Sequence, residues 1–267
     1  MIRRIDTLSY NSRFYSLSPL WKCGFAALMF LLSYFAHPIV QILIALWMLY
    51  WTIKRAQTPL RYYLILFGIS SLFLISSLPA LLLEIGRTGS LREAAISYEI
   101  VTGTDYTLYV TQAGLYQAAT LATRIAACVT CLFFVIFTTP VPQLLQVMQR
   151  LRIPSLVIEI TLIMYRFVFL LEETAAEMMV AQRARGGYVS FSGKLRDVAM
   201  LTVRLFIKTM HRYRGLSHGL IARGFTDDLG LAPDRAQPLP RRFLLEGLLG
   251  AMLLISLELW LRWRGMR

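Results

Sequence analysis

Residues 62–83 read YYLILFGISSLFLISSLPALLL, a run that contains no charged side chain. A helix needs about 20 apolar residues to cross the hydrocarbon core of a bilayer, and only Pro79, near the end, interrupts this one. The run is therefore predicted to span a membrane. Similar runs occupy residues 24–36, 39–53, 116–139 and 243–261. We predict an all-α polytopic membrane protein with about five transmembrane helices.

The first two runs meet at His37-Pro38. A proline disfavours helix at the residue before it, so a tight helical hairpin is expected here. Each arm is short for a full crossing, so flanking residues must contribute or the helices must end near the interface. Farther along, residues 97–110 (SYEIVTGTDYTLYV) place β-branched and aromatic residues around Gly103, a pattern typical of a small β-hairpin.

Composition agrees with a membrane protein. Of 267 residues, 57% are hydrophobic and 16% charged, and the mean hydropathy is +0.56. The net charge of +13 would suit a nucleic-acid-binding protein, but Lys and Arg are also enriched in cytoplasmic loops that face anionic lipid. The second explanation covers more of the sequence. The first 22 residues are too polar for a cleavable signal peptide, so we expect the N-terminus to be retained.

The distribution of basic residues predicts the orientation. Lys and Arg flank the cytoplasmic ends of the runs at Arg3, Arg4, Arg13, Lys22, Lys54, Arg55, Arg61, Arg150 and Arg152. By the positive-inside rule, the N-terminus and residues 140–242 are cytoplasmic. The predicted domains are residues 1–139 with about four spans, a cytoplasmic domain at 140–242, and a last span with its tail at 243–267. This topology leaves Arg262, Arg264 and Arg267 outside, against the same rule.

Two long amphipathic helices are predicted within residues 140–242. The first carries a mostly acidic seam and the second a basic stripe with a residue every four positions. The seam comprises Glu159, Arg166, Glu173 and Glu177, and the stripe comprises Arg204, Lys208 and Arg212. The opposite signs invite pairing between the helices, and solvent exposure of both stripes is the alternative.

Each of these helices ends in Ala-Arg-Gly. The motifs are Ala184-Arg185-Gly186, within AQRARGGY at 181–188, and Ala222-Arg223-Gly224, within LIARGFT at 220–226. Glycine suits the residue after a helix, where a left-handed backbone is common, and arginine suits the negative end of the helix dipole. A purely structural cap therefore explains either motif alone. It does not explain the duplication, whereas an arginine between two small residues is free to enter a pocket of another protein.

These motifs and three further stretches resemble the transmembrane T component of energy-coupling factor (ECF) transporters, most closely the cobalt-transport branch of that family. The further stretches are RIDTLS at 4–9, FTTPVPQLLQVMQRLRIP at 137–154 and YRFVFLLEE at 165–173. The similarity covers nearly the whole chain and is strongest over residues 138–225. The main departure from the family pattern is the Arg-rich C-terminal tail.

The resemblance implies a crossed pair of coupling helices and a division of labour among subunits. A separate membrane subunit, with or without a small accessory membrane subunit, would capture cobalt or nickel. Two ABC-type ATPase subunits would bind ATP and magnesium. This chain, in the cell membrane, would link them through Arg185 and Arg223 in grooves of the ATPases. A T component that serves a vitamin-binding subunit is the alternative within the family.

Other classes of function find less support in the sequence. Cys128-x-x-Cys131 lacks a second ligand pair, and His37, His211 and His218 are scattered, so no metal site is expected; the two cysteines are interpreted as small residues at a helix contact. Residues 187–194 differ from a P-loop in spacing and in Leu195, which replaces Ser or Thr.

We therefore expect no catalysis, metal or cofactor on this chain. A membrane-embedded enzyme would have only Glu159 and Arg166 as polar candidates in the bilayer. A nucleic-acid-binding protein would need aromatic residues interleaved with its basic ones, and none is evident.

Overall fold

The computed structural model describes residues 2–82, 84–87, 96–102, 106–188, 190–224 and 241–264. The chain forms two compact units. The first combines Met1–Pro140 with Arg235–Arg267, and the second is Val141–Asp234. Each is described by itself.

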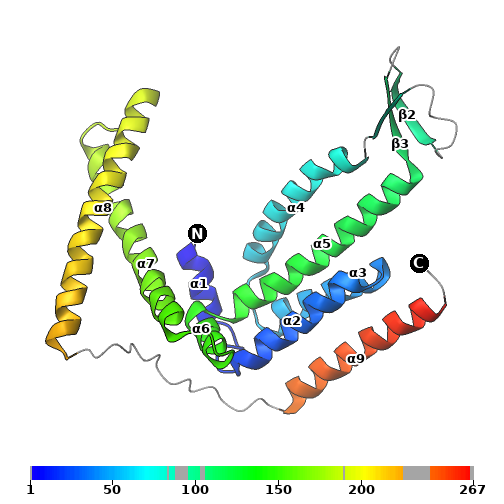
Figure 1. Cartoon of the computed structure of the whole chain (residues 1–267), viewed down its shortest axis with the longest axis horizontal. Helices are drawn as coiled ribbons and strands as arrows, with labels where there is room; N and C mark the ends of the chain where they lie inside the picture. Colours follow the sequence, from blue (N-terminus) through cyan, green and yellow to red (C-terminus); the bar gives the residue numbers. More distant parts are fainter. Residues whose placement is uncertain are drawn as a thin grey trace. The chain divides into compact units, whose positions relative to one another are not determined.

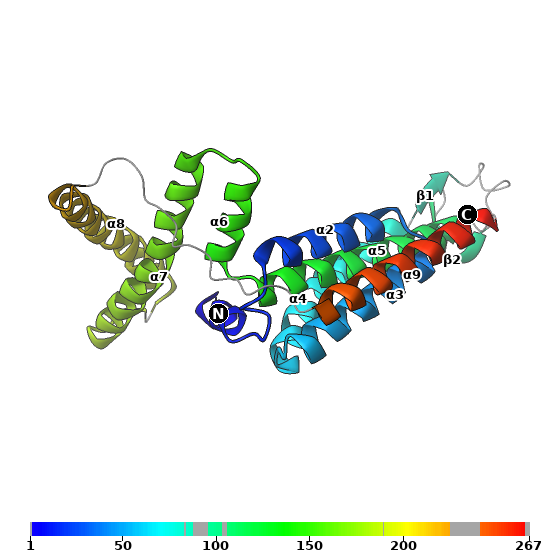
Figure 2. The same cartoon turned by 90° about the horizontal axis from the view of Figure 1, so that it is seen from below.

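The first unit is a bundle of helices. Its elements are α1 (Ile2–Tyr10), α2 (Pro19–Phe35), α3 (Pro38–Tyr50), a π-helical turn η1 (Trp51–Arg55), α4 (Leu60–Leu82), α5 (Gln112–Thr138) and α9 (Arg241–Trp263). Helix α5 packs against α2, α3 and α4, and α9 packs against α2 and α3 (Figures 1 and 2). Among the described residues, α4, α5 and α9 are long and apolar enough to cross a membrane, and α2 is a shorter apolar helix. The prediction of a helical, polytopic membrane protein is confirmed, with one small sheet beside the helices.

Prolines set the beginnings of α2 and α3. Pro19 and Pro38 each occupy the first turn of their helix, where the missing N–H is not needed and the fixed φ favours helix. His37 is extended, with φ −63° and ψ 149°, which makes the predicted hairpin turn. Helix α2 therefore starts five residues before the apolar run at residue 24, and η1 continues α3 to Arg55. Together these extensions lengthen both short arms of the hairpin.

A small antiparallel sheet lies between α4 and α5 in the chain. Strands β1 (Glu84–Arg87), β2 (Ile96–Thr102) and β3 (Tyr106–Thr111) are ordered β1-β3-β2. The pair β2–β3 is the hairpin that the sequence predicts, and β1 is an additional strand. Gly103, at its predicted turn, lies outside the described residues.

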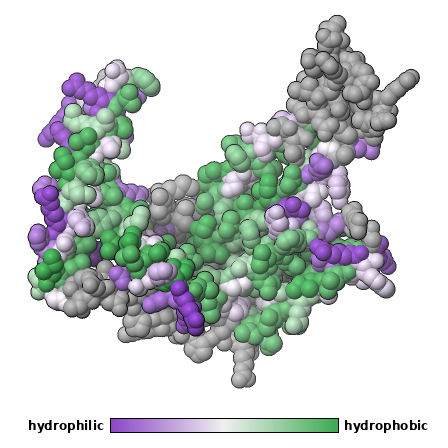
Figure 3. All heavy atoms as spheres, viewed as in Figure 1, coloured by the Kyte–Doolittle hydropathy of each residue, from purple (hydrophilic) through white to green (hydrophobic). Residues whose placement is uncertain are grey.

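The core of the first unit is aromatic. Trp51 is fully buried and its ring lies against those of Phe14, Trp21 and Phe25, with centroids 5.4 to 5.8 Å apart. By contrast, only 6% of the apolar window of α4 is buried inside the chain. Figure 3 shows the resulting apolar face over the helices of this unit. Such a surface requires lipid or another apolar partner.

Lys22, which the sequence suggests is a loop charge, is fully buried in α2. Its Nζ donates to the carbonyl of Phe14 at 3.1 Å and to that of Thr138 at 3.0 Å. A buried ammonium is tolerated only when its hydrogen bonds are made. Lys22 therefore ties the segment before α2 to the last turn of α5.

Helix α9 is joined to the hairpin by packing, by an ion pair and by a hydrogen bond. A Cβ on Gly250 would lie 2.5 Å from the Trp47 ring, so only glycine permits this approach. Near the beginning of α9, Glu246 pairs with Arg55. Near its end, the buried Glu258 accepts the His37 N–H at 2.9 Å.

Contacts at this end of α9 also explain in part why arginines at the C-terminus depart from the positive-inside rule. Arg262 donates to Glu258 Oε1 at 2.8 Å and to the Phe35 carbonyl at 2.7 Å. Arg262 thus satisfies an unpaired carbonyl at the end of α2. Its charge serves the packing of the bundle, which the positive-inside rule does not take into account.

The described residues of the second unit form three helices, α6 (Val141–Arg150), α7 (Ser155–Ala184) and α8 (Phe191–Ala222). Helix α7 packs on α6 and crosses α8 (Figures 1 and 2). Helix α7 buries only Ile158 and Thr174, and none of the 32 residues of α8 is buried. Phe191, Phe206 and Ile221 of α8 are 87%, 64% and 70% exposed. The described part of this unit therefore leaves a large apolar surface uncovered.

Candidate functional site

The two Ala-Arg-Gly motifs share one backbone conformation. Arg185 has φ −95° and ψ 15°, and Arg223 has φ −92° and ψ 8°. The glycines that follow have φ +80° at Gly186 and +68° at Gly224, in the region that side chains other than glycine disfavour. The sequence repeat is thus a structural repeat, and the glycines act as helix caps.

The hydrogen bonds of the two turns also correspond. The amides of Arg185 and Gly186 donate to the carbonyls of Gln182 and Arg183, both at 3.1 Å. The amides of Arg223 and Gly224 donate to the carbonyls three residues before them at 3.1 and 3.0 Å. Each turn therefore presents its arginine in the same way relative to its helix.

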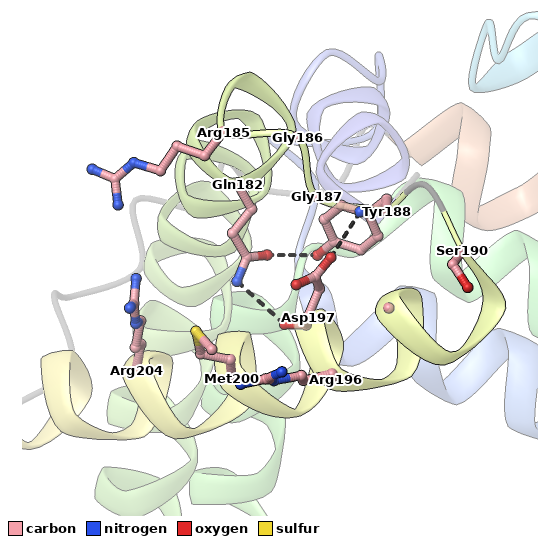
Figure 4. Close-up of a pocket in the computed structure, with 11 residues that line it drawn as sticks. Gln182, Arg185, Gly186, Gly187, Tyr188, Ser190, Arg196, Asp197, Met200 and Arg204 are labelled. Atoms are coloured by element: carbon pink, nitrogen blue, oxygen red, sulfur yellow. Dashed lines mark hydrogen bonds between the residues drawn. The ribbon is translucent and has the colours of Figure 1, made fainter.

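Both arginine side chains are free for another protein. Arg185 and Arg223 are exposed, as are Ala184 and Ala222 beside them. Neither arginine forms an ion pair with another described residue. Figure 4 shows Arg185 pointing away from the side chains of the neighbouring turn.

The motifs lie at opposite ends of α8. The first motif begins at the last residue of α7, Ala184, and enters the short connection that leads into the start of α8, and the second begins at the last residue of α8, Ala222. At 1.5 Å per residue, the 32 residues of α8 measure about 48 Å. That length is greater than the diameter of a small domain, so the two ends of α8 are far apart.

The predicted stripes meet at one point. Lys208 Nζ lies 3.6 Å from Glu177 Oε2, close to the buried Thr174. The other members form no ion pair within the described ranges: Glu159, Arg166, Glu173, Arg204 and Arg212.

The geometry of crossed helices explains the single pair. Each step of four residues overshoots a full turn by about 40°, so three residues spaced four apart cannot all face the same neighbour. Only the middle one, Lys208, forms an ion pair with a described residue of α7, while Arg212 lines a small pocket with Phe167 and Thr174 of that helix. Helices that cross also contact each other over a limited length.

Glu159 and Arg166, the candidates for membrane-embedded catalysis, do not converge. They are seven residues apart on α7, about 10 Å along its axis. Arg166 instead lines an apolar cavity of about 330 Å³ with Phe167, Leu216 and Leu220. Within the described ranges, no three His, Cys, Asp or Glu side chains lie close enough to hold a metal ion.

The first motif has polar neighbours that the sequence reasoning missed. The Tyr188 N–H donates to Asp197 Oδ2 and the Tyr188 hydroxyl to Gln182 Oε1, both at 2.7 Å. The Gln182 amide donates to the Asp197 carbonyl at 3.2 Å. Figure 4 shows these three side chains gathered between the end of α7 and the start of α8. One signal was available, because Asp197 is the only acidic residue of α8.

The model for the family described as "Cobalt transport protein", CbiQ, matches residues 13–231 of this chain. The chain belongs to the CbiQ family. The match spans both Ala-Arg-Gly motifs, and it confirms the resemblance inferred from the sequence.

Two named CbiQ relatives align along most of the chain, and a fused relative aligns along about half of it. The cobalt transport protein CbiQ of Rhodobacter capsulatus is 31% identical over 90% of this chain and 91% of its own length. CbiQ of Salmonella typhimurium is 27% identical over 85% and 99%. A putative fused cobalt transport protein CbiMQ of Methanocorpusculum labreanum is 28% identical over 49% of this chain and 22% of its own length.

The two other candidate motifs have local structural explanations. Cys128 and Cys131 are free thiols on α5, where Cys128 Sγ lies 3.4 Å from Ser33 Oγ of α2 and Cys131 is in the core. The prediction of a helix contact at these cysteines is confirmed. The P-loop-like stretch from Gly187 connects α7 to α8 and includes the first turn of α8.

Proposed function

We propose that this chain is the transmembrane coupling subunit, or T component, of an ECF-type importer that takes up cobalt or nickel. One observation carries the proposal: two exposed arginines stand on identical turns at opposite ends of α8. A helix cap explains each turn, but not why both leave an unpaired arginine between small residues. Residues 141–234 would be the coupling domain.

Two ATPase subunits fit the spacing of the motifs. About 48 Å separates the ends of α8, so a single groove would not hold both arginines. Each would enter the groove of one ATPase, where its planar fork of donors meets carboxylate or carbonyl oxygens. ATP and magnesium would bind to the ATPases, whose opening and closing would move the two ends of α8.

A membrane subunit that binds the substrate would account for the exposed apolar surface. Helix α4 is almost unburied within the chain, and α8 exposes Phe191, Phe206 and Ile221. The fused CbiMQ relative suggests a CbiM-type protein as this partner. Lipid would cover the remainder, with the N-terminus and residues 141–234 on the cytoplasmic side of the cell membrane.

The test is purification of the complex in mild detergent after co-expression with its ATPase and membrane partners. Removing one partner of a buried interfacial charge pair costs about 2 to 5 kcal/mol. Arg185→Ala or Arg223→Ala should therefore retain part of the ATPase and reduce uptake steeply. The combined Arg185→Glu, Arg223→Glu variant should release the ATPase altogether.

Arg214→Glu is the matched control, because Arg214 is exposed on α8 outside either motif. It should retain ATPase and uptake. Full ATPase content with normal uptake in the combined variant would reduce both arginines to helix caps. Uptake of a vitamin instead of cobalt or nickel would favour the vitamin-type T component.

A further inference from the structure

We propose that Gln182, Tyr188 and Asp197 form a clamp that fixes the first Ala-Arg-Gly turn and the direction of Arg185, so that the two ATPase-docking sites are unequal. The inference rests on the proposed function and adds to it positioning residues that act through Arg185. It also predicts a preformed docking site at one end of α8.

The clamp joins the end of α7 to the second turn of α8. The Asp197 carboxylate accepts the Tyr188 N–H, and the Gln182 side chain bonds both the Tyr188 hydroxyl and the Asp197 carbonyl. All three residues are partly buried, whereas Arg185 is exposed. Three side chains thus hold the turn from inside and leave the arginine outside.

The backbone within the clamp is strained. Tyr188 has φ +67°, a conformation that residues with a side chain rarely adopt. Such strain persists where surrounding contacts over-determine the geometry. The hydrogen bonds to the amide and the hydroxyl of Tyr188 supply those contacts.

Gly187 shows how closely the parts fit. A Cβ at this position would lie 2.9 Å from the Gln182 carbonyl oxygen and 3.0 Å from Asp197 Oδ2. The Gly187 amide also donates to the Gln182 carbonyl at 3.0 Å. Only glycine allows the chain to pass between α7 and α8 here, so the second glycine of AQRARGGY is part of the clamp.

The second motif has no such support in the part of the chain that the structure describes. Arg223 and Gly224 are held there by main-chain hydrogen bonds alone. The first turn can therefore present Arg185 in one direction before the ATPase arrives. Loss of the clamp should therefore weaken docking through Arg185 and leave docking through Arg223 unchanged.

Two single variants of the intact complex each leave one of the two docking sites working, so the sites can be tested one at a time. In Arg223→Ala, ATPase is retained through the first motif, and in Arg185→Ala, through the second. Asp197→Ala should weaken retention about tenfold in the first background, the usual effect of losing a hydrogen bond to a charged group. In the second background it should have no effect.

Two conservative variants test the chemistry. Asp197→Asn keeps an oxygen that accepts the Tyr188 N–H, so it should retain most of the ATPase. Tyr188→Phe loses only the hydroxyl bond to Gln182 and should weaken retention about threefold, again only in the Arg223→Ala background. Because Tyr188→Phe removes only one hydroxyl, it still tests the clamp if Asp197→Ala does not fold.

Equal losses in both backgrounds would overturn the clamp, because a general loss of stability does not distinguish the motifs. Unchanged retention by Asp197→Ala and Tyr188→Phe in the Arg223→Ala background would also overturn it. The proposed function is tested separately. It fails if neither Arg185→Ala nor Arg223→Ala changes ATPase retention or uptake.

Discussion

Alanine at Gly224 and at Gly215 should have opposite effects on the same helix. Both positions have open space where a Cβ would be added, so clashes play no part. Gly224 has φ +68°, and a side chain there costs about 1 to 2 kcal/mol. Gly215 is inside α8, where alanine is favoured over glycine by about 0.5 to 1 kcal/mol. The two variants should differ by about 1.5 to 3 kcal/mol in the opening of the last turns of α8.

Hydrogen exchange measured by mass spectrometry on the whole chain in detergent checks this difference. A shift of about 1.4 kcal/mol changes the population of the open state tenfold. Amides 220–224 should exchange about 5- to 30-fold faster than wild type in Gly224→Ala, and more slowly than wild type in Gly215→Ala. Equal exchange in the two variants would refute the left-handed cap at Gly224. The Gly224 variant should also bind less ATPase, because the turn that presents Arg223 is disturbed.

Three further predictions concern the bundle, the crossing and metal. Glu258→Ala should lower stability by about 1 to 3 kcal/mol because the His37 N–H loses its acceptor. Glu246→Ala removes a half-exposed ion pair and should cost about 0 to 1 kcal/mol. Similar losses of thermal stability for the two variants in detergent would contradict this ranking. Exchanging Glu177 and Lys208 singly should cost about 0 to 1 kcal/mol, since their side chains are 65% and 40% exposed, and the double exchange should restore part of it; strict additivity would show that the pair does not interact. The isolated, tag-free chain should bind neither cobalt nor nickel stoichiometrically, and a one-to-one metal content by elemental analysis would overturn that expectation.

Local chemistry was predictable from the sequence. Pro38 and the glycines of the two motifs act on their immediate backbone, so their positions alone indicated the hairpin and the caps. The apolar runs likewise indicated the spans, because the bilayer fixes the length that a helix needs.

Features that depend on how helices meet were not predictable in this way. Of the three basic residues, only Lys208 forms an ion pair with α7. Helices that cross contact each other over a limited length, and the sequence does not show where that length lies. Asp197 is nine residues from Tyr188 in sequence, and their contact exists only because α8 folds back beside α7. Lys22 resembled a flanking charge, and its burial depends on carbonyls contributed by the segment before α2 and by the end of α5.

The order of synthesis gives the contacts of α9 a further meaning. A ribosome makes α1 to α5 first, then about 100 residues of the second unit, and only then α9, which at 5 to 20 residues per second takes about 5 to 20 s. During that interval the nascent bundle lacks the acceptors for Arg55 and the His37 N–H. A chain that terminates before α9 would lack the partners that Glu246 and Glu258 provide for Arg55 and the His37 N–H, and it would lack the close contact of Gly250 with the Trp47 ring.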